Sequence, residues 1–329
     1  GDLNMGMTET IDRIFFDYRG ILATDESTGT IEKRLASVGR ESTAETRHDY
    51  RHTLFATSGI SPFIGGVILF DETLKSPLTI EPLRAQNIEL GIKVDKGVKE
   101  YGYGTVTEGL DGLTERLFEY RDLGATFAKW RGVIKPIANP ENVKANSAVM
   151  AIYAKRCQET GIVPIVEPEV LMDGTHGIGK SYAATNMALQ ELFKSLIGQS
   201  VDLEKIILKP NMVVTGYASH VRASSEEVAE WTIRCLKQNV PAAVPAVAFL
   251  SGGQKDEEAL VNLTRMNRVY TPWTMSFSFG RTLQGGALHC WSEGRGSDAQ
   301  KWLAQRAREC SEAVGRRKEE VSNIWDSGL

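Results

Sequence analysis

The sequence predicts an α/β protein with a single (β/α)8 barrel and extra helical segments at its N- and C-terminal ends. Two observations carry this prediction: eight short apolar runs recur along the chain, and segments with helix start signals separate them. Apolar strands joined by helices form a parallel sheet that is covered on both faces, and eight such units favour closure into a barrel. A doubly wound open sheet is the alternative architecture.

The eight apolar runs are the predicted strands. They cover residues 20–27, 65–72, 91–97, 126–134, 161–169, 205–211, 246–253 and 274–281. The carboxyl ends of parallel barrel strands meet at one mouth of the barrel, where the active sites of such folds lie. The residues that end these runs are therefore expected to gather around one site.

The segments between the strands carry recognisable helix starts. Capping boxes are predicted for Ser42 with Glu45, Ser224 with Glu227 and Ser297 with Gln300, and a cap is predicted at Asn139 before Pro140. Two segments also repeat apolar residues on one helical face: Val228, Trp231, Cys235 and Leu236, and Leu303, Ala307, Cys310 and Val314. These signals place helices between the strands.

One domain is expected, because no low-complexity linker or shift in composition divides the chain. The barrel domain is predicted over residues 8–329, with residues 297–329 as a C-terminal helix and tail. The opening "GDLNMGM" at residues 1–7 lacks the basic and apolar regions of a signal peptide. We expect it to be an expression scar and set it outside the fold.

The composition excludes several classes of protein. The 38 basic and 42 acidic residues give a net charge of −4, so no broad cationic field is expected to bind nucleic acid or an anionic membrane. The longest apolar stretch, residues 240–250, is too short to span a bilayer and contains two prolines. The four cysteines form no CxxC pair, which favours a reduced, cytoplasmic protein.

A metal site is not expected. His48 and His52 lie four residues apart, but the segment is charged and offers no third ligand, so a solvated helix face is the preferred interpretation. The remaining histidines, His176, His220 and His289, are isolated in the sequence. No cofactor is predicted.

Ionisable residues end one predicted strand after another. They are Asp25, Asp71, Lys93, Lys129, Arg131, Glu167, Glu169, Lys209 and Arg281. Lys209 lies in the middle of an otherwise apolar run, "KIILKPNMV" at 205–213, where an isolated charge is so costly that the amine tends to lose its proton and become a nucleophile. A nearby Lys129 would favour the neutral amine further, through like-charge repulsion. The alternative is that Lys209 is a structural cation paired with Glu167.

Two glycine turns predict an anion site. "SGG" at 251–253 follows the seventh strand and "FGR" at 279–281 follows the eighth, where barrels often bind a phosphate through backbone N–H groups. The segment "DESTGTIEKR" at 25–34 offers a second group of hydroxyls and N–H groups. Together with the lysines, these turns predict a substrate with two phosphates.

These motifs resemble one family. "LATDESTGTIEKRL", "GGVILFDETL", "GIKVDKG", "FAKWR", "GIVPIVEPEVLMDG", "LKPNMV", "VAFLSGGQ" and "FSFGR" are similar, in order and spacing, to class I fructose-1,6-bisphosphate aldolase. The resemblance covers Gly20 to Trp291. It implies a metal-independent (β/α)8 lyase of glycolysis and gluconeogenesis, a homotetramer that cleaves fructose 1,6-bisphosphate to dihydroxyacetone phosphate and glyceraldehyde 3-phosphate.

The resemblance also implies roles for single residues. Lys209 matches the lysine that forms a Schiff base with the C2 ketone, Glu167 the general acid and base, Asp25 the carboxylate near the C4 hydroxyl, Lys129 a charged partner, and Glu169 a helper. The residues matching contacts to the C1 phosphate are Ser251, Gly252, Gly253, Ser278, Gly280 and Arg281, with Arg34 on the substrate-binding list. Ser27 and Lys93 match the far phosphate, and Arg131 is a further substrate-binding residue.

The chain departs from the family pattern in two places. Animal members end in a tyrosine that assists proton transfer at C3 of the enamine, whereas this chain ends "NIWDSGL", and Trp325 cannot replace a phenol. The segment "KSPLTIEPLRAQNIEL" between the second and third strands is also short. Either the tail is truncated or another group donates the proton.

Two other hypotheses remain at this stage. Another Schiff-base barrel, such as a transaldolase or an aldolase acting on sedoheptulose 1,7-bisphosphate or fructose 1-phosphate, would use the same kind of site. A scaffold or adhesin built on an aldolase fold is the non-enzymatic alternative. The complete set of Asp25, Lys129, Glu167 and Lys209 favours an active enzyme.

Overall fold

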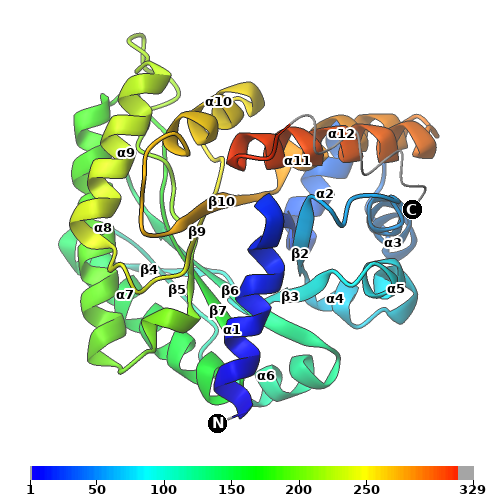
Figure 1. The fold of residues 1–329 in the computed structure, drawn as a ribbon, viewed down its shortest axis with the longest axis horizontal. Helices are drawn as coiled ribbons and strands as arrows, with labels where there is room; N and C mark the ends of the chain where they lie inside the picture. The colour runs from blue at the N-terminus through cyan, green and yellow to red at the C-terminus, as the bar shows by residue number, and fades with distance from the viewer. Residues whose placement is uncertain (1, 318–329) are drawn as a thin grey trace.

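Eight parallel strands close into a barrel in the computed structural model, which describes residues 2–317 (Figure 1). Around the barrel the strands follow the order β1, β10, β9, β8, β7, β6, β3, β2. Their bounds are Gly20–Thr24 (β1), Ile64–Leu69 (β2), Glu89–Lys93 (β3), Ala125–Ile134 (β6), Val163–Val170 (β7), Ile207–Leu208 (β8), Ala246–Phe249 (β9) and Thr274–Phe279 (β10). All eight predicted strands are present, and the open doubly wound sheet is excluded.

Several predicted strands are longer than the observed ones, because the runs continue into the loops that follow. The clearest case is the run 205–211, of which only Ile207–Leu208 is a strand. Lys209 still donates its backbone N–H to the carbonyl of Val166, at 2.9 Å. Pro210 has no N–H to continue the ladder, so the strand ends and the lysine side chain stands at the mouth of the barrel.

Helices cover the outside of the barrel. They are Asp2–Phe15 (α1), Thr28–Ser37 (α2), Ala44–Phe55 (α3), Asp71–Leu74 (α4), Pro77–Ala85 (α5), Leu113–Asp122 (α6), Pro140–Glu159 (α7), Ile178–Gly198 (α8), Ser225–Asn239 (α9), Asp256–Met266 (α10), Arg281–Ser292 (α11) and Gly296–Val314 (α12). Two 3-10 turns, Phe16–Tyr18 and Leu203–Lys205, and a hairpin of Val98–Tyr101 (β4) with Gly104–Thr107 (β5) complete the described chain.

Two predicted helix caps are confirmed. Ser224 accepts from the N–H of Glu227, whose carboxylate accepts from the N–H of Ser224 in return. Asn139 caps the helix that begins at Pro140. The predicted apolar faces are also buried, except that Trp231 is half-buried and contacts Tyr182 edge-on.

Two predicted caps are wrong. The cap of α3 is Thr43 with Thr46, one residue later than Ser42 with Glu45, because the hydroxyl of Ser42 binds the guanidinium of Arg47 instead. Helix α12 begins at Gly296, so Ser297 is already inside it. The amide of its supposed partner, Gln300, donates to a carbonyl of α3.

Helix α1 closes the N-terminal mouth of the barrel. Its apolar residues Met7, Ile11 and Ile14 form one core cluster with the inward side chains of the strands, and α1 crosses in front of the barrel in Figure 1. The contact is so close that a Cβ on Gly65 would lie 2.0 Å from the carbonyl oxygen of Ile14. Residues 2–7, which were set outside the fold, are thus helical, although their origin as a scar stays a prediction.

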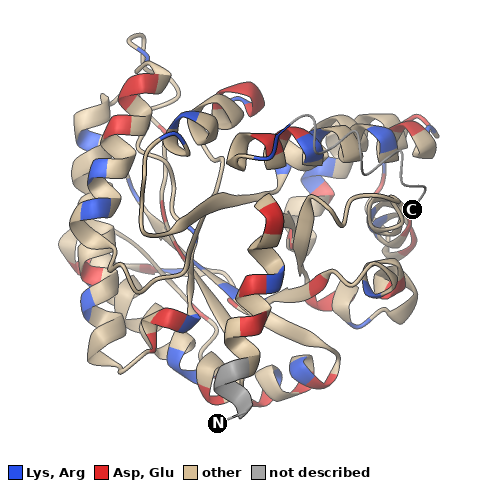
Figure 2. Ribbon diagram, in the orientation of Figure 1, with Lys and Arg blue, Asp and Glu red and all other residues tan. Residues whose placement is uncertain are grey.

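The surface carries both signs of charge. Lys, Arg, Asp and Glu residues are interspersed on the helices around the barrel (Figure 2).

A second, larger core lies between the strands and these helices. Within residues 2–317, no helix is long and apolar enough to cross a bilayer. The predicted tail beyond residue 317, with Trp325, lies outside the described residues.

Candidate active site

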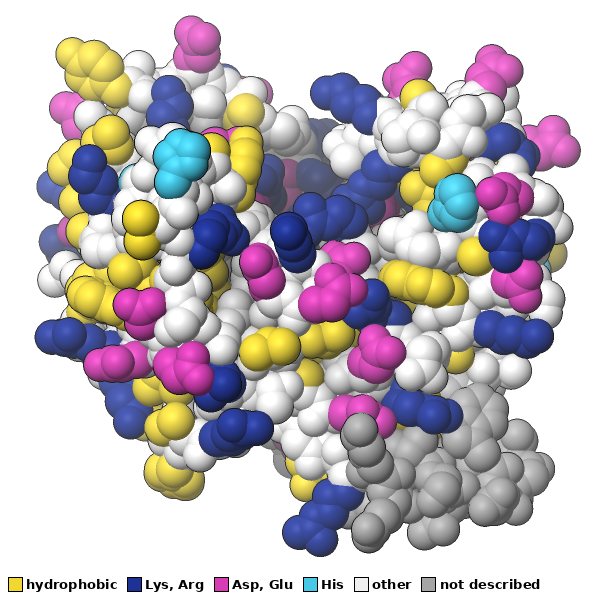
Figure 3. Space-filling view, turned by 90° about the horizontal axis from the view of Figure 1, so that it is seen from above, with side chains coloured by type: hydrophobic (Ala, Val, Ile, Leu, Met, Phe, Trp, Pro, Cys, Tyr) yellow, Lys and Arg dark blue, Asp and Glu magenta, His cyan; other side chains and the backbone are white. Residues whose placement is uncertain are grey.

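A cavity of about 1260 Å³ opens at the C-terminal ends of the barrel strands, opposite α1. The surface is hollowed between two raised flanks, with Lys and Arg side chains in and beside the hollow (Figure 3). Every site residue predicted from the sequence except Gly253 lines the cavity: Asp25, Ser27, Arg34, Lys93, Lys129, Arg131, Glu167, Glu169, Lys209, Ser251, Gly252, Ser278, Gly280 and Arg281. Residues far apart in the chain therefore meet at one site.

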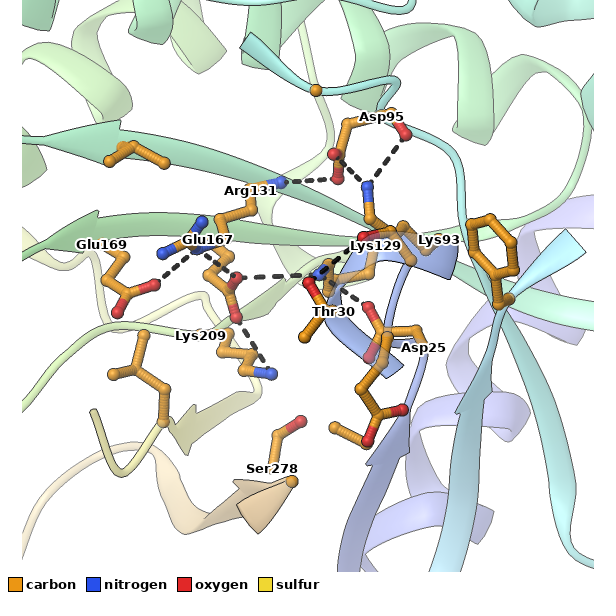
Figure 4. Close-up of a pocket in the computed structure, with 18 of the residues that line it drawn as sticks. Asp25, Thr30, Lys93, Asp95, Lys129, Arg131, Glu167, Glu169, Lys209 and Ser278 are labelled. Carbon is orange, nitrogen blue, oxygen red and sulfur yellow. Dashed lines mark hydrogen bonds and ion pairs between the residues drawn. The ribbon is translucent and has the colours of Figure 1, made fainter. Parts of the chain in front are cut away.

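Glu167 lies at the centre of the charged residues. Its Oε2 atom is 2.9 Å from the Nζ atom of Lys209, and its Oε1 atom is 3.8 Å from the Nζ atom of Lys129 and 3.7 Å from the Nε atom of Arg131. The lysine nitrogen of Lys209 points into the site rather than into bulk water (Figure 4). Glu167, Lys129 and Lys209 are each about 5% exposed or less. The buried carboxylate of Glu167 thus forms ion pairs with the ammonium groups of both lysines.

Lys129 connects this centre to the first strand. Its Nζ atom donates to Oδ2 of Asp25 at 2.7 Å (Figure 4). Asp25 follows the end of β1, and Lys129 and Arg131 lie two residues apart on β6, so both side chains leave the strand on the same side. On β7, Glu167 and Glu169 share the same spacing, and Glu169 accepts from the Nε atom of Arg131 at 2.5 Å.

The buried charges shift one another's protonation. Burial would raise the pKa of Asp25, but the ammonium groups of Lys129 and Lys209 outweigh it and lower that pKa to about 2. Burial would likewise raise the pKa of Glu167, and Lys209, Lys129 and Arg131 together lower it. Conversely, burial would lower the pKa of Lys129, but Asp25 and Glu167 raise it above its usual value. Both carboxylates are thereby kept ionised.

The two glycine turns lie on one side of the cavity. A Cβ on Gly252 would meet Oε1 of Glu169 at 2.9 Å, and a Cβ on Gly280 would meet the carbonyl oxygen of Ala23 at 3.3 Å, so both positions suit glycine. Gly280 is the N-cap of α11, whose first N–H groups have no partner within the helix. Such N–H groups bind anions. Arg281 begins this helix and donates to the carbonyl of Gln254 at 2.6 Å.

Gly253 is the predicted site residue that does not line the cavity. Its φ of +78° lies in the left-handed region, and a Cβ there would meet Met172 at 2.5 Å. Its place in the structure is therefore in the turn rather than at the cavity wall. Ser278, in contrast, is 1% exposed, lines the cavity and has a hydroxyl with no hydrogen-bond partner among the described residues.

The second predicted anion region follows β1, which pairs with β10, so it begins beside the FGR turn. Ser27 is the N-cap residue of α2 but does not cap it with its hydroxyl, which contacts the hydroxyl of Thr30 at 3.2 Å instead. The guanidinium of Arg34 is paired with Glu26 at 2.6 Å. Lys93, at the end of β3, is paired with Asp95.

The family model for fructose-bisphosphate aldolase class-I matches residues 6–324 of the chain. The chain belongs to the class I fructose-bisphosphate aldolase family. A relative from Xanthomonas axonopodis pv. citri, named "Probable fructose-bisphosphate aldolase class 1", is 46% identical over 92% of this chain and 95% of its own length. The cytoplasmic isozyme from Cicer arietinum is 47% identical over 90% of this chain and 87% of its own.

A solved aldolase structure agrees with the barrel. The fructose-bisphosphate aldolase from Plasmodium falciparum, in complex with TRAP and a small molecule inhibitor, matches with a TM-score of 0.93 at 40% identity, covering 95% of each chain. These comparisons confirm the predicted resemblance, the (β/α)8 fold and the function as a class I fructose-bisphosphate aldolase, a lyase. The other Schiff-base sugar aldolases considered from the sequence are not favoured.

Several cavity residues were missed from the sequence. They are Ala23, Glu26, Thr30, Phe70, Lys75, Asp95, Lys96, Gly97, Val98, Arg116, Tyr120, Val133, Leu171 and Leu250. Asp95 could have been found, since it follows Lys93 by two residues in a motif that had already been singled out. Arg116 and Tyr120 come from α6, where nothing in the helical pattern distinguishes a residue that faces a cavity.

Proposed function

We propose that Lys209 is the nucleophile of this aldolase and forms a Schiff base with the C2 ketone of fructose 1,6-bisphosphate. The single observation that carries the proposal is the position of its amine, 5% exposed inside the cavity and 2.9 Å from Glu167. A carboxylate within hydrogen-bond reach can accept the proton of the ammonium and leave the neutral amine that attacks a carbonyl.

Glu167 then moves the protons of imine formation. After the neutral amine of Lys209 has bonded to C2, one proton of its nitrogen passes to the C2 oxygen to give a carbinolamine. The proton that Glu167 took from the ammonium then converts that hydroxyl to water, which leaves and yields the protonated imine. Lys129 and Arg131 lie within 4 Å of Glu167 and favour its ionised form before it takes up the proton and after it has returned it. A buried acid and base held in one orientation suits both directions of this transfer.

Asp25 is proposed to act at the C3–C4 bond. It accepts the proton of the C4 hydroxyl as the bond breaks, and the bond electrons move to the protonated imine, giving an enamine. Glyceraldehyde 3-phosphate leaves, and protonation of C3 and hydrolysis of the imine release dihydroxyacetone phosphate. Lys129, which donates to Asp25 at 2.7 Å, orients that carboxylate and stabilises negative charge that develops nearby.

The two phosphates are proposed to bind at two separate places in the cavity. Backbone N–H groups at Gly252 and Gly280, the side chains of Arg281 and Arg34, and the hydroxyls of Ser251 and Ser278 would bind the C1 phosphate. Gly253 would support this site by allowing the turn. Lys93 and Ser27, with the first N–H groups of α2, would bind the phosphate at C6.

Arg131 and Glu169 are proposed to serve the central carboxylate. Arg131 contacts Glu167 and Glu169 with the same Nε atom, at 3.7 and 2.5 Å. Burial would lower the pKa of Arg131, but Glu169 and Glu167 raise it, so the guanidinium stays charged. Glu169 therefore orients Arg131, and Arg131 presents its remaining N–H groups to the substrate.

The reaction is proposed to need no metal and no cofactor, because the imine nitrogen provides the electron sink that a metal ion would otherwise supply. Within residues 2–317, no three His, Cys, Asp or Glu residues are placed to hold a metal ion. The donor of the C3 proton stays open as predicted, because the C-terminal segment with Trp325 lies outside the described residues.

The protein is also proposed to be a cytoplasmic homo-oligomer, a tetramer by family resemblance. The cytosolic relatives from plants and the free thiols of all four cysteines support the compartment. Exposed aromatic residues on the β4–β5 hairpin, Tyr101 and Tyr103, offer apolar surface to a second copy. Light scattering coupled to gel filtration would give the number of copies.

The proposal is tested by substitution of the nucleophile. Lys209→Ala and Lys209→Arg should both lose cleavage of fructose 1,6-bisphosphate, because neither side chain forms an imine under the assay conditions. Lys237→Arg, on an exposed position of α9, is the matched control and should keep wild-type activity. Retained cleavage in Lys209→Ala would contradict the assignment of the nucleophile.

A further inference from the structure

Asp95 holds the ammonium of Lys93 from two sides. Lys93 ends β3, and its Nζ atom donates to Oδ1 of Asp95 and, at 3.0 Å, to the backbone carbonyl oxygen of the same residue. The other carboxylate oxygen of Asp95 accepts from the backbone N–H of Arg131 on β6, at 3.2 Å. Figure 4 shows Asp95 above both residues, at the edge of the cavity.

This arrangement leaves Lys93 little freedom. An ammonium group has three N–H donors, and Asp95 takes two of them. The Asp95 side chain is 6% exposed and that of Lys93 is 16% exposed, so neither end of the pair is free in solvent. Since Arg131 anchors the second oxygen of Asp95, the carboxylate cannot rotate without breaking a bond to β6. One N–H of Lys93 remains for a ligand.

Asp95 also adds a negative charge to a cavity rich in cations. Lys93, Lys129, Arg131 and Lys209 are four of the cations that line the cavity, and Asp25, Asp95, Glu167 and Glu169 are the anions paired with them. Besides its bonds to Lys93, Asp95 lies close enough to help raise the pKa values of Lys129 and Arg131, each after larger contributions from other residues. The negative charge of Asp95 therefore acts on Lys129 and Arg131 as well as on Lys93.

We propose that Asp95 is a positioning residue that fixes the Lys93 ammonium where the phosphate at C6 of the substrate meets it. A lysine that is already ordered loses less conformational freedom when it binds a phosphate, which strengthens binding. The pair thereby favours a sugar with a phosphate at each end over one with a phosphate at C1 alone. This inference depends on the proposed placement of the C6 phosphate at Lys93.

The test compares fructose 1,6-bisphosphate with fructose 1-phosphate, which lacks the C6 phosphate. Asp95→Asn keeps the shape and removes the charge. It should raise KM for the bisphosphate about three- to tenfold, the range expected when one long side chain must be ordered on binding. For fructose 1-phosphate, both KM and kcat should change less than twofold. For the bisphosphate, kcat should also change less than twofold.

Lys93→Met tests the placement of the C6 phosphate at Lys93 separately from the role of Asp95. If Lys93 binds the C6 phosphate, Lys93→Met lowers the preference for the bisphosphate, and adding Asp95→Asn to it changes nothing further. If Lys93→Met leaves the preference intact, the placement of the phosphate fails, and the inference on Asp95 fails with it. If Lys93→Met lowers the preference but Asp95→Asn does not, the placement holds and only the role of Asp95 is overturned.

Other outcomes would also overturn the inference. Equal losses with both substrates, or the same loss in the Lys93→Met background, would assign Asp95 a role in the fold or in holding Arg131. Tighter binding of the bisphosphate by Asp95→Asn would show that Asp95 competes with the phosphate for Lys93. Should Asp95→Asn not fold, Asp95→Glu keeps the charge but moves it by one methylene, and a smaller, still bisphosphate-specific rise in KM is expected.

Discussion

The Nζ atom of Lys209 lies 2.9 Å from Oε2 of Glu167, and both residues are buried at the mouth of the barrel. Two further cations contact the other oxygen of the same carboxylate. A carboxylate that is ionised at rest can accept a proton from the neighbouring ammonium and return it later. In the proposed mechanism, the site thus provides a nucleophile and its proton carrier as one unit.

Replacing Glu167 with Gln should lower kcat by roughly 10²- to 10⁴-fold, the usual loss when a general acid or base is removed. KM should change little, because the phosphates supply most of the substrate binding. Steady-state assays on fructose 1,6-bisphosphate measure both constants. Glu169→Gln is the matched control on the same strand face, and a loss as large as that of Glu167→Gln would contradict the separate roles given to the two carboxylates.

Low pH should destabilise the protein partly through Asp25. Its pKa is lowered from 3.8 to about 2, so its ionised form stabilises the fold by about 2 kcal/mol above pH 4. That contribution is lost as the pH falls from about 4 through 2, where the folded carboxylate takes up its proton.

The measurement is the midpoint of thermal unfolding between pH 6 and pH 2.5. Asp25→Asn should be less stable than wild type at pH 6, because Lys129 loses its partner, and its midpoint should fall less steeply with acid. Parallel curves for the two proteins would show that Asp25 is not held ionised by the lysines.

Ser278→Ala should weaken substrate binding without lowering the stability of the fold. The hydroxyl of Ser278 is buried without a partner among the described residues, so its removal should leave the thermal midpoint unchanged or slightly higher. If the hydroxyl binds the C1 phosphate, KM should rise about tenfold, as for a lost hydrogen bond to a charged group. An unchanged KM would remove Ser278 from the phosphate site.

Chelators should not affect the activity. Lysine imine chemistry uses the protein's own nitrogen as the electron sink, so dialysis against EDTA should leave kcat and KM at their starting values. Addition of zinc or cobalt after dialysis should then bring no increase. A loss on dialysis that a divalent metal restores would contradict the proposed mechanism.

The sequence was sufficient to predict the barrel and most residues of the cavity wall, because both follow from local patterns. Apolar runs with charged ends specify strands, and the topology brings their ends together. Which of the charged strand ends pair with one another could not be predicted from these local patterns. That Lys129 on β6 would bind Asp25 after β1 depends on the lateral order and register of the strands. The pair of Lys93 with Asp95 is local, and was missed because Asp95 was not considered as a site residue.

Other features were missed for equally specific reasons. Residues 2–7 carry no signal that separates a terminal scar from the first turns of a helix, yet Met7 packs into the barrel core. Ser42 and Thr43 are both good caps, and only the contact between Ser42 and Arg47 decides between them. Gly253 matched a phosphate motif in sequence, but its backbone turns it toward Met172.

The central claim is that Lys209 forms the covalent bond to substrate, and trapping of the imine tests it most directly. The enzyme would be incubated with dihydroxyacetone phosphate and sodium borohydride, digested, and its peptides sequenced by mass spectrometry. We predict one three-carbon phosphate adduct on the peptide that carries Lys209, and its absence in Lys209→Ala. An adduct on Lys93 or Lys129 in the wild-type enzyme, with Lys209 unmodified, would contradict the account.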